Sequence, residues 1–243
     1  MTATILVRGL TKCFGRVRAL SGIDLAIPGG RVTAVVGPNA AGKSTLIKCL
    51  LGLVRPDQGE MFVQGERVTA DPAYRRRIGY MPQAARFPEN LTGREVLDLL
   101  AELRDNPPDP DDELIGRLDL EASLDKPVRT LSGGTRQKLS AVVAFRFRPS
   151  VLILDEPTAS LDPVASAELK DRIRQAAGAG ATVLLTSHVM AEVEELADEM
   201  VFMVEGRIRF HGTLDQLRLA THERKIERAV ARLLREDLPG RVA

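Results

Sequence analysis

Residues 37–45 read GPNAAGKST, and this stretch indicates the fold class. A glycine, four residues, a second glycine, a lysine and a hydroxyl residue form a pattern typical of a loop that binds nucleoside triphosphates. Gly37 and Gly42 allow the backbone N–H groups to face phosphates, and the helix that follows adds its positive N-terminus. Lys43 is predicted to reach the β- and γ-phosphates, and Ser44 to hold Mg²⁺. The candidate phosphate-binding residues are Gly37, Pro38, Asn39, Ala40, Ala41, Gly42, Lys43, Ser44 and Thr45.

The flanks of this loop have the required order of strand, loop and helix. Residues 31–36 (RVTAVV) are a β-branched run suited to a buried strand, and residues 44–51 (STLIKCLL) read as a helix closed by Gly52. The pattern recurs later in the chain. It predicts strands over 78–81, 151–154 and 182–186, and a helix over 163–177. Such alternation favours a parallel sheet covered by helices.

Two other regions have a different character. Before the loop and just after its helix, short apolar runs between turn residues predict antiparallel strands over 5–7, 23–27, 60–64 and 67–69. Residues 84–150 are predicted to form a mainly helical lobe, with helices over 92–103, 114–120 and 135–147 and an acidic, proline-rich loop over 105–113. After a predicted hairpin (200–204 and 207–210), residues 213–234 read as one or two arginine-rich helices, interpreted as a solvated face.

Composition narrows the classes of partner. The 243 residues include 34 Lys and Arg against 33 Asp and Glu, a balance that gives no reason to expect a nucleic-acid partner. The two cysteines, Cys13 and Cys49, stand far apart and suggest neither a disulfide framework nor a zinc site. No apolar run approaches the ~20 residues that span a bilayer, and the first residues do not resemble a signal peptide. We therefore expect a cytoplasmic protein that would reach a membrane only by docking to another chain.

A predicted strand that ends in two carboxylates supplies the second part of the candidate site. Residues 151–156 read VLILDE. In this arrangement Asp155 holds Mg²⁺ through water, and Glu156 sits beside the γ-phosphate. Glu156 can polarise the attacking water as a general base if that water lies within hydrogen-bonding distance.

Residues 131–135 (LSGGT) come shortly before that strand, and Ser132, Gly133 and Gly134 open a predicted helix. A helix start of this kind is a second anion site. With GPNAAGKST, VLILDE, YMPQ at 80–83, ASLD at 159–162 and SH at 187–188, the chain resembles the ATP-binding subunits of ATP-binding-cassette (ABC) transporters over residues 4 to about 212. In that family the signature loop reads LSGGQ and lies just before the strand with the two acids.

The resemblance implies an α/β fold: a P-loop NTPase (RecA-like) core with an antiparallel β subdomain and an inserted α-helical lobe. It implies an ABC ATPase domain over residues 1–212 and a helical extension over 213–243. The implied activity is ATP binding and hydrolysis that energises transport through a separate transmembrane permease subunit, with this chain peripheral on the cytoplasmic face of the membrane.

The resemblance also assigns roles to single residues. It implies that Gln83 contacts Mg²⁺ and the attacking water, that His188 contacts the γ-phosphate, and that Phe14 stacks on adenine. Two positions depart from the family. Ala40 replaces a glycine of the phosphate loop and would be strained if the backbone there required positive φ. Thr135 replaces the last glutamine of the signature.

Because the helical lobe projects from the core, its signature is not expected to reach the phosphates bound by Lys43 of the same chain. A second chain must supply Ser132, Gly133 and Gly134. Two subunits, a homodimer or a pair of ATPase subunits, are therefore predicted to pair head to tail around two ATP molecules and to drive the permease through the lobe beside Gln83.

Two alternatives stay open at the level of sequence. One is a soluble ABC ATPase that acts on DNA or ribosomes, although such relatives typically carry a coiled-coil insertion or two cassettes. The other is a phosphotransferase or regulatory switch that shares only the phosphate loop. The sequence gives almost no information about the transported substrate. The string LSGGTRQKLSAVVAF (131–145) is similar to ATPases of the ABC-2 export class, including those that help assemble the copper centres of nitrous oxide reductase.

Overall fold

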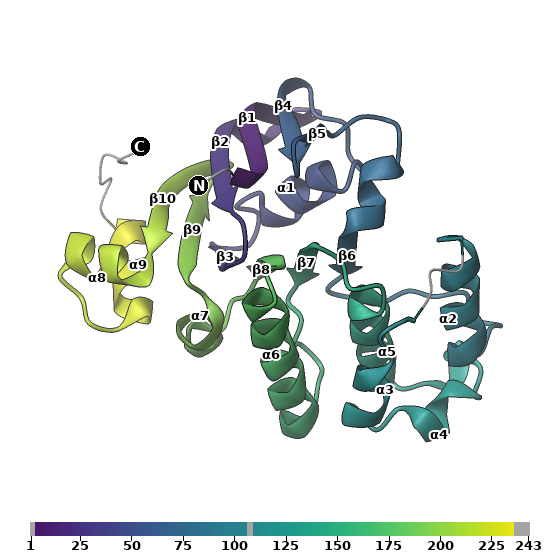
Figure 1. Ribbon diagram of the computed structural model, residues 1–243. Coiled ribbons are helices and arrows are strands. Elements are labelled where there is room, and N and C mark those ends of the chain that lie inside the picture. The colour runs from purple at the N-terminus through teal and green to yellow at the C-terminus, as the bar shows by residue number, and fades with distance from the viewer. Residues whose placement is uncertain (1–2, 106–108, 236–243) are drawn as a thin grey trace.

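The computed structural model describes residues 3–105 and 109–235, which contain two β-sheets with helices around them (Figure 1). The larger sheet has six strands in the order β10-β9-β3-β8-β7-β6. The strands β6, β7, β8, β3 and β9 run parallel, and β10 pairs antiparallel with β9. Their bounds are β3 Val32–Val36, β6 Ile78–Met81, β7 Val151–Asp155, β8 Thr182–Thr186, β9 Glu199–Val204 and β10 Arg207–Thr213. The predicted parallel sheet is confirmed.

Alternate residues of the central strands enter two different hydrophobic cores. Every residue of β3, β7 and β8 is buried, as expected for parallel strands covered on both faces. Val35 packs with α1 (Lys43–Leu50) and the smaller sheet, whereas Ala34 and Val36 pack on the opposite face. In Figure 1 α1 lies above the sheet, and α5 (Gly133–Phe145), α6 (Pro163–Gly178) and α7 (Met190–Leu196) lie below it.

The smaller sheet is antiparallel, with the order β2-β1-β4-β5. Its strands are β1 Ala3–Phe14, β2 Val17–Pro28, β4 Gln58–Val63 and β5 Glu66–Arg67. The antiparallel prediction is confirmed, but β1 and β2 extend well beyond the predicted runs 5–7 and 23–27. The register shifts between Val7 and Leu10, where Gly9 has φ 55°, so the pairing of β1 continues across a bulge.

The helices between β6 and β7 are α2 Gly93–Glu102, α3 Glu113–Arg117, α4 Glu121–Leu124 and α5, and the 3₁₀ turn η2 Val128–Thr130 comes just before α5. A second 3₁₀ turn, η1 Ala73–Arg77, precedes β6. The predicted start of α2 is confirmed by a capping box between Thr92 and Glu95. Helix α5 begins two residues earlier than predicted, because the Ser132 side chain accepts the backbone N–H of Thr135. Part of the predicted loop 105–113, residues 106–108, lies outside the described residues.

The chain ends in a β9–β10 hairpin followed by α8 (Leu214–Thr221) and α9 (Ile226–Arg235). The hairpin was predicted, and the one or two helices predicted over 213–234 are two in the structure, whereas α7, of seven residues, was not predicted. Residues 236–243 of the predicted extension lie outside the described part of the chain. No helix within residues 3–105 and 109–235 is long and apolar enough to cross a membrane.

Candidate functional site

The phosphate loop lies between β3 and α1, and close backbone contacts explain its glycines. A Cβ on Gly37 would collide with the carbonyl oxygen of Met203. Gly42 has φ 102° and precedes the first residue of α1, where a Cβ would lie 2.5 Å from the carbonyl oxygen of Ala19. Only glycine tolerates such close approach of backbone at this φ. These contacts fix the path by which the loop enters α1.

Lys43, the first residue of α1, crosses the mouth of this loop. Its Nζ donates hydrogen bonds to the carbonyl oxygens of Gly37 at 2.6 Å and Pro38 at 3.0 Å. Burial lowers the pKa of Lys43 from its usual value, while the negative charges of Glu156 and Asp155 act in the opposite direction. The lysine is thus a partly desolvated cation that faces two carboxylates, an arrangement suited to an anionic ligand between them.

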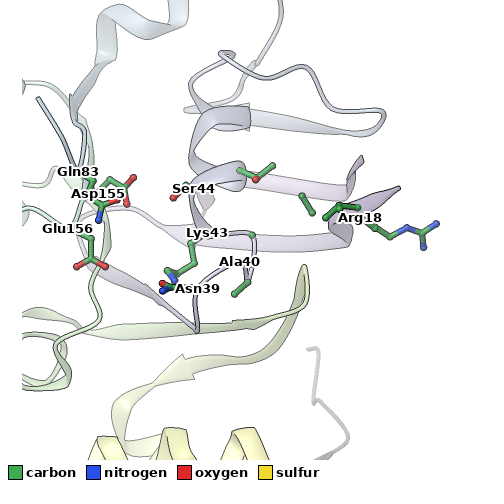
Figure 2. Close-up of a pocket in the computed structure, with 13 residues that line it drawn as sticks. Arg18, Asn39, Ala40, Lys43, Ser44, Gln83, Asp155 and Glu156 are labelled. Carbon is green, nitrogen blue, oxygen red and sulfur yellow. The ribbon is translucent and has the colours of Figure 1, made fainter. Parts of the chain in front are cut away.

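A cavity of about 330 Å³ lies between the loop and the end of β7. Figure 2 shows Glu156, Asp155 and Gln83 on one side of it and Lys43, Ser44 and Asn39 on the other. The cavity is lined by Val17, Arg18, Ala19, Asn39, Ala40, Ala41, Gly42, Lys43, Ser44, Thr45, Gln83, Asp155 and Glu156. Residues from three separate motifs of the sequence therefore meet at one cavity.

Sequence reasoning missed three of the lining residues: Val17, Arg18 and Ala19 of β2. They reach the cavity because Ser21 N–H donates to the carbonyl oxygen of Gly206 at 2.8 Å, which holds β2 against the β9–β10 hairpin. The guanidinium of Arg18 extends away from the other labelled residues (Figure 2). Their position three to five residues after Phe14 was the one available signal.

The two carboxylates at the end of β7 are held by Thr186, the last residue of β8. Thr186 Oγ1 donates to Asp155 Oδ1 at 2.6 Å, and the N–H of Glu156 contacts both Oγ1 (3.0 Å) and the carbonyl oxygen (3.2 Å) of Thr186. Glu156 has φ 52°, which is uncommon for a residue with a side chain. The bonds to Thr186 compensate for that conformation.

His188 meets Glu156 at this edge of the sheet. His188 Nδ1 lies 2.8 Å from Glu156 Oε2, and the backbone N–H of His188 donates to the same oxygen at 3.3 Å. The His188 side chain is 72% exposed, whereas that of Glu156 is 11% exposed. The carboxylate is thus oriented by a histidine that solvent or a ligand can reach.

Ser44, Gln83 and Asp155, the predicted Mg²⁺ ligands, line the same cavity. They offer a hydroxyl, an amide and a carboxylate oxygen, which are donors that Mg²⁺ prefers. The described residues contain no cluster of three or more His, Cys, Asp and Glu suited to a metal. This sparse set fits Mg²⁺, which keeps several waters and shares its coordination with phosphate oxygens.

Six predicted cofactor-binding residues do not line the cavity. Phe14 ends β1, is 50% exposed, and has Lys12 Nζ 5.4 Å from its ring centroid. The signature residues Ser132, Gly133 and Gly134 lie at the start of α5, where Ser132 and Gly133 are exposed. Gly37 and Pro38 also lie outside the lining. The carbonyl oxygen of each accepts a hydrogen bond from Lys43 Nζ.

Comparison with known proteins identifies the family. Residues 20–159 match the family model described as ABC transporter. The chain belongs to the ABC transporter family. The daunorubicin resistance ATP-binding protein DrrA3 of Streptomyces coeruleorubidus is 40% identical over 228 residues, which cover 92% of this chain and 72% of that protein.

Solved structures agree with the fold. An ATP-binding subunit of an ABC transporter superposes with a TM-score of 0.87 and 31% identity, covering 95% of this chain and 99% of that one. A dimeric ATP-binding cassette in a post-hydrolysis state, bound to ADP and Pi, has a TM-score of 0.77 at 20% identity, covering 86% of this chain and 98% of that one. The fold is that of a P-loop NTPase, and this ABC transporter ATP-binding subunit hydrolyses ATP to energise transport.

Proposed function

We propose that the cavity between the phosphate loop and β7 is where this chain binds and hydrolyses ATP. The observation that carries the proposal is that Lys43, Asp155 and Glu156 line one cavity while coming from distant parts of the sequence. Residues 37–45 cradle the β- and γ-phosphates, and the positive N-terminus of α1 adds to the charge of Lys43. Phe14 stacks on the adenine from the neighbouring strand pair.

Ser44, Gln83 and Asp155 are proposed to hold Mg²⁺. An ion held by these residues would supply positive charge that offsets the negative charge developing on the phosphate oxygens. Thr186 fixes Asp155 through its 2.6 Å hydrogen bond, so the carboxylate is oriented before any ligand arrives. Gln83 lies in the loop that leads from β6 into the helical lobe (84–150), which we propose as a unit within the ATPase domain (1–212).

In the proposed reaction Glu156 accepts a proton from a water molecule whose oxygen attacks the γ-phosphorus. The bond between that phosphorus and the oxygen bridging to the β-phosphate breaks, and ADP leaves. His188 holds the Glu156 carboxylate at 2.8 Å and presents its other ring nitrogen to the γ-phosphate. Lys43 stabilises the charge on the leaving phosphate oxygens.

We further propose that a second subunit completes the site, with Ser132, Gly133 and Gly134 of one chain against the ATP of the other. Two observations support this. The signature residues lie outside the cavity of their own chain, and Ser132 and Gly133 are exposed at the start of a 13-residue helix. The structural neighbour with ADP and Pi is itself dimeric.

The transport partner is proposed to be a separate permease chain, with this subunit peripheral on the cytoplasmic face of the membrane. We favour export, since a relative at 40% identity confers resistance to daunorubicin by its description. Copper-centre assembly, predicted from residues 131–145, is a narrower version of the ABC-2 hypothesis. The alternative of a soluble ATPase acting on DNA or ribosomes finds no support in the residues of the cavity.

Purification of the tagged chain from its own host tests these proposals in one experiment. Membranes are dissolved in mild detergent, and the co-purifying chains are identified by mass spectrometry. We expect a polytopic membrane protein in fixed proportion, together with ATPase activity that Lys43→Ala abolishes. Recovery with ribosomal proteins or DNA, and no membrane protein, would contradict the permease proposal while leaving the ATPase site intact.

A further inference from the structure

Two loops at the carboxyl edge of the larger sheet carry the proposed catalytic pair. The loop after β7 begins with Glu156, and the loop after β8 contains His188. A third side chain, Glu192 of α7, contacts both loops. Thr158 Oγ1 donates to Glu192 Oε1 at 2.7 Å, and Ser187 Oγ donates to Glu192 Oε2 at 3.1 Å. One carboxylate thus joins the two loops through its two oxygens.

The positions of these contacts along the chain are informative. Thr158 stands two residues after Glu156, and Ser187 stands directly before His188. Ser187 is 1% exposed and also accepts the backbone N–H of Val189 at 3.0 Å, which fixes the direction in which its hydroxyl donates. Hydrogen bonds to an ionised carboxylate are about twice as strong as neutral ones. The loops cannot separate without breaking one of these bonds.

The His188 side chain has little packing to hold it, whereas Glu156 is mostly buried and bonded to Thr186. His188 is largely exposed, and the direct contacts between the two residues are those that Glu156 Oε2 makes with the ring and backbone of His188. We propose that Glu192 is a positioning residue for ATP hydrolysis. By joining Thr158 to Ser187, it holds Glu156 and His188 at a fixed position relative to each other. The inference rests on the proposed roles of Glu156 and His188.

The same carboxylate connects the pair to the helix that carries the signature. Residues 159–162 follow Thr158 directly, and Asp162 pairs with Lys138 of α5 at 3.0 Å. A Cβ on Gly134 would lie 2.9 Å from the carbonyl oxygen of Ser160. Helix α5 therefore contacts the same loop after β7 that Glu192 binds through Thr158.

The central test compares Glu192→Ala with Glu192→Gln in the purified full chain. For Glu192→Ala we expect kcat to fall roughly tenfold or more, because small displacements of catalytic groups have large effects on rate. The Kd for ATP stays within about twofold, since Lys43 and the phosphate loop lie on the other side of the cavity. Glu192→Gln restores most of kcat, because its amide oxygen can accept from Thr158 and its amide nitrogen can donate to Ser187 Oγ.

A matched control stands on the same helix. Glu195 contacts Lys170 and Arg174 of α6, each at 2.6 Å, and Glu195→Gln therefore breaks charged contacts of α7 without touching either loop. We expect that variant to keep its kcat. Thr158→Val and Ser187→Ala each remove one of the two hydrogen bonds to Glu192. Each is expected to lower kcat several-fold with Kd unchanged, and neither should add to the loss in Glu192→Ala.

Wild-type kcat in Glu192→Ala overturns the inference, as does an equal loss in Glu195→Gln, which would indicate a general effect on α7. If Glu192→Ala does not fold, Thr158→Val and Ser187→Ala decide the question. Wild-type kcat in both of these variants overturns the inference. Glu156→Gln is measured in parallel. If it hydrolyses ATP normally, the proposed catalytic role fails; if it is inactive while Glu192→Ala is fully active, only the role of Glu192 fails.

Discussion

Glu156 Oε2 lies 2.8 Å from His188 Nδ1 and also accepts the backbone N–H of His188, although the two residues stand 32 positions apart in the sequence. The contact arises because β7 and β8 are parallel neighbours whose carboxyl ends meet at one edge of the sheet. It orients a carboxylate that is 11% exposed toward a cavity shared with Lys43.

Glu156→Gln is expected to keep ATP binding and lose turnover. Glutamine has the same shape but cannot accept the proton of water, and general bases contribute about 10²–10⁴-fold to rate. Because ATP persists, the variant should also accumulate as a dimer in the presence of ATP. Titration with ATP, phosphate release and size-exclusion chromatography measure the three effects. Hydrolysis at the wild-type rate would remove Glu156 from the catalytic role.

His188→Ala is expected to lower kcat by roughly tenfold to a hundredfold, because it removes the side chain that orients Glu156. The free energy of unfolding should change by less than about 0.5 kcal/mol, since the side chain is exposed. His211→Ala is the control, because His211 pairs with Glu199 at 3.5 Å, away from the cavity lining. Equal losses in the two variants would contradict a specific role for His188.

Much of this site could be predicted from sequence because its parts follow buried parallel strands. The strand over 182–186 has the predicted bounds, and the carboxyl ends of such strands must share one edge of the sheet. Local chemistry also sufficed for the capping box at Thr92 and for the glycines of the phosphate loop. In these cases the determining interactions lie within a few residues of the motif.

The features that escaped prediction depend on contacts between distant segments. Arg18 and Ala19 reach the cavity because β2 packs against the β9–β10 hairpin, and no local pattern records that contact. Glu192 belongs to a seven-residue helix, and α4 has four residues, lengths too short to display helical periodicity. Strand β1 exceeded its apolar run because a bulge at Gly9 allowed pairing to continue.

Cys49 should make stability depend on pH in the alkaline range. Burial raises the pKa of this thiol from 9.0 to about 11, with a smaller opposing effect of Lys12. Below pH 9 the thiol is protonated in both states. Between pH 9 and 11 the unfolded chain loses the proton while the folded chain keeps it, so stability falls as pH rises, by up to about 2–3 kcal/mol.

Urea unfolding of the wild type and of Cys49→Ala at several pH values from 8 to 11 measures this effect. Other groups titrate in the same range, so the informative quantity is the difference in slope between the two proteins. We expect the wild type to lose stability more steeply. Parallel slopes would mean that Cys49 keeps an ordinary pKa in the folded chain.

Ala40→Gly is expected to relieve strain in the phosphate loop. Ala40 has φ 64°, a left-handed conformation that costs an alanine roughly 1–2 kcal/mol, while glycine loses about 0.4–1 kcal/mol through its more flexible unfolded chain. The net gain in the free energy of unfolding is between about 0 and 1.6 kcal/mol, and ATP affinity should be retained. Ala41→Gly is the control, because Ala41 is 2% exposed and its methyl packs in the core. Destabilisation by both variants to the same extent would contradict strain at Ala40.

Ser132→Ala separates the two roles of the signature serine. Ser132 Oγ accepts the N–H of Thr135 at 3.1 Å and caps α5, so its loss should cost about 1 kcal/mol of stability. It should also impair ATP-dependent dimerisation and hydrolysis while the monomer still binds ATP, because the hydroxyl is proposed to serve the partner's nucleotide. Thr213→Val removes an equivalent cap from α8 and should cost similar stability without affecting dimerisation. If both variants dimerise as well as wild type, or if Ser132→Ala weakens ATP binding by the monomer, the signature does not act on the opposite chain.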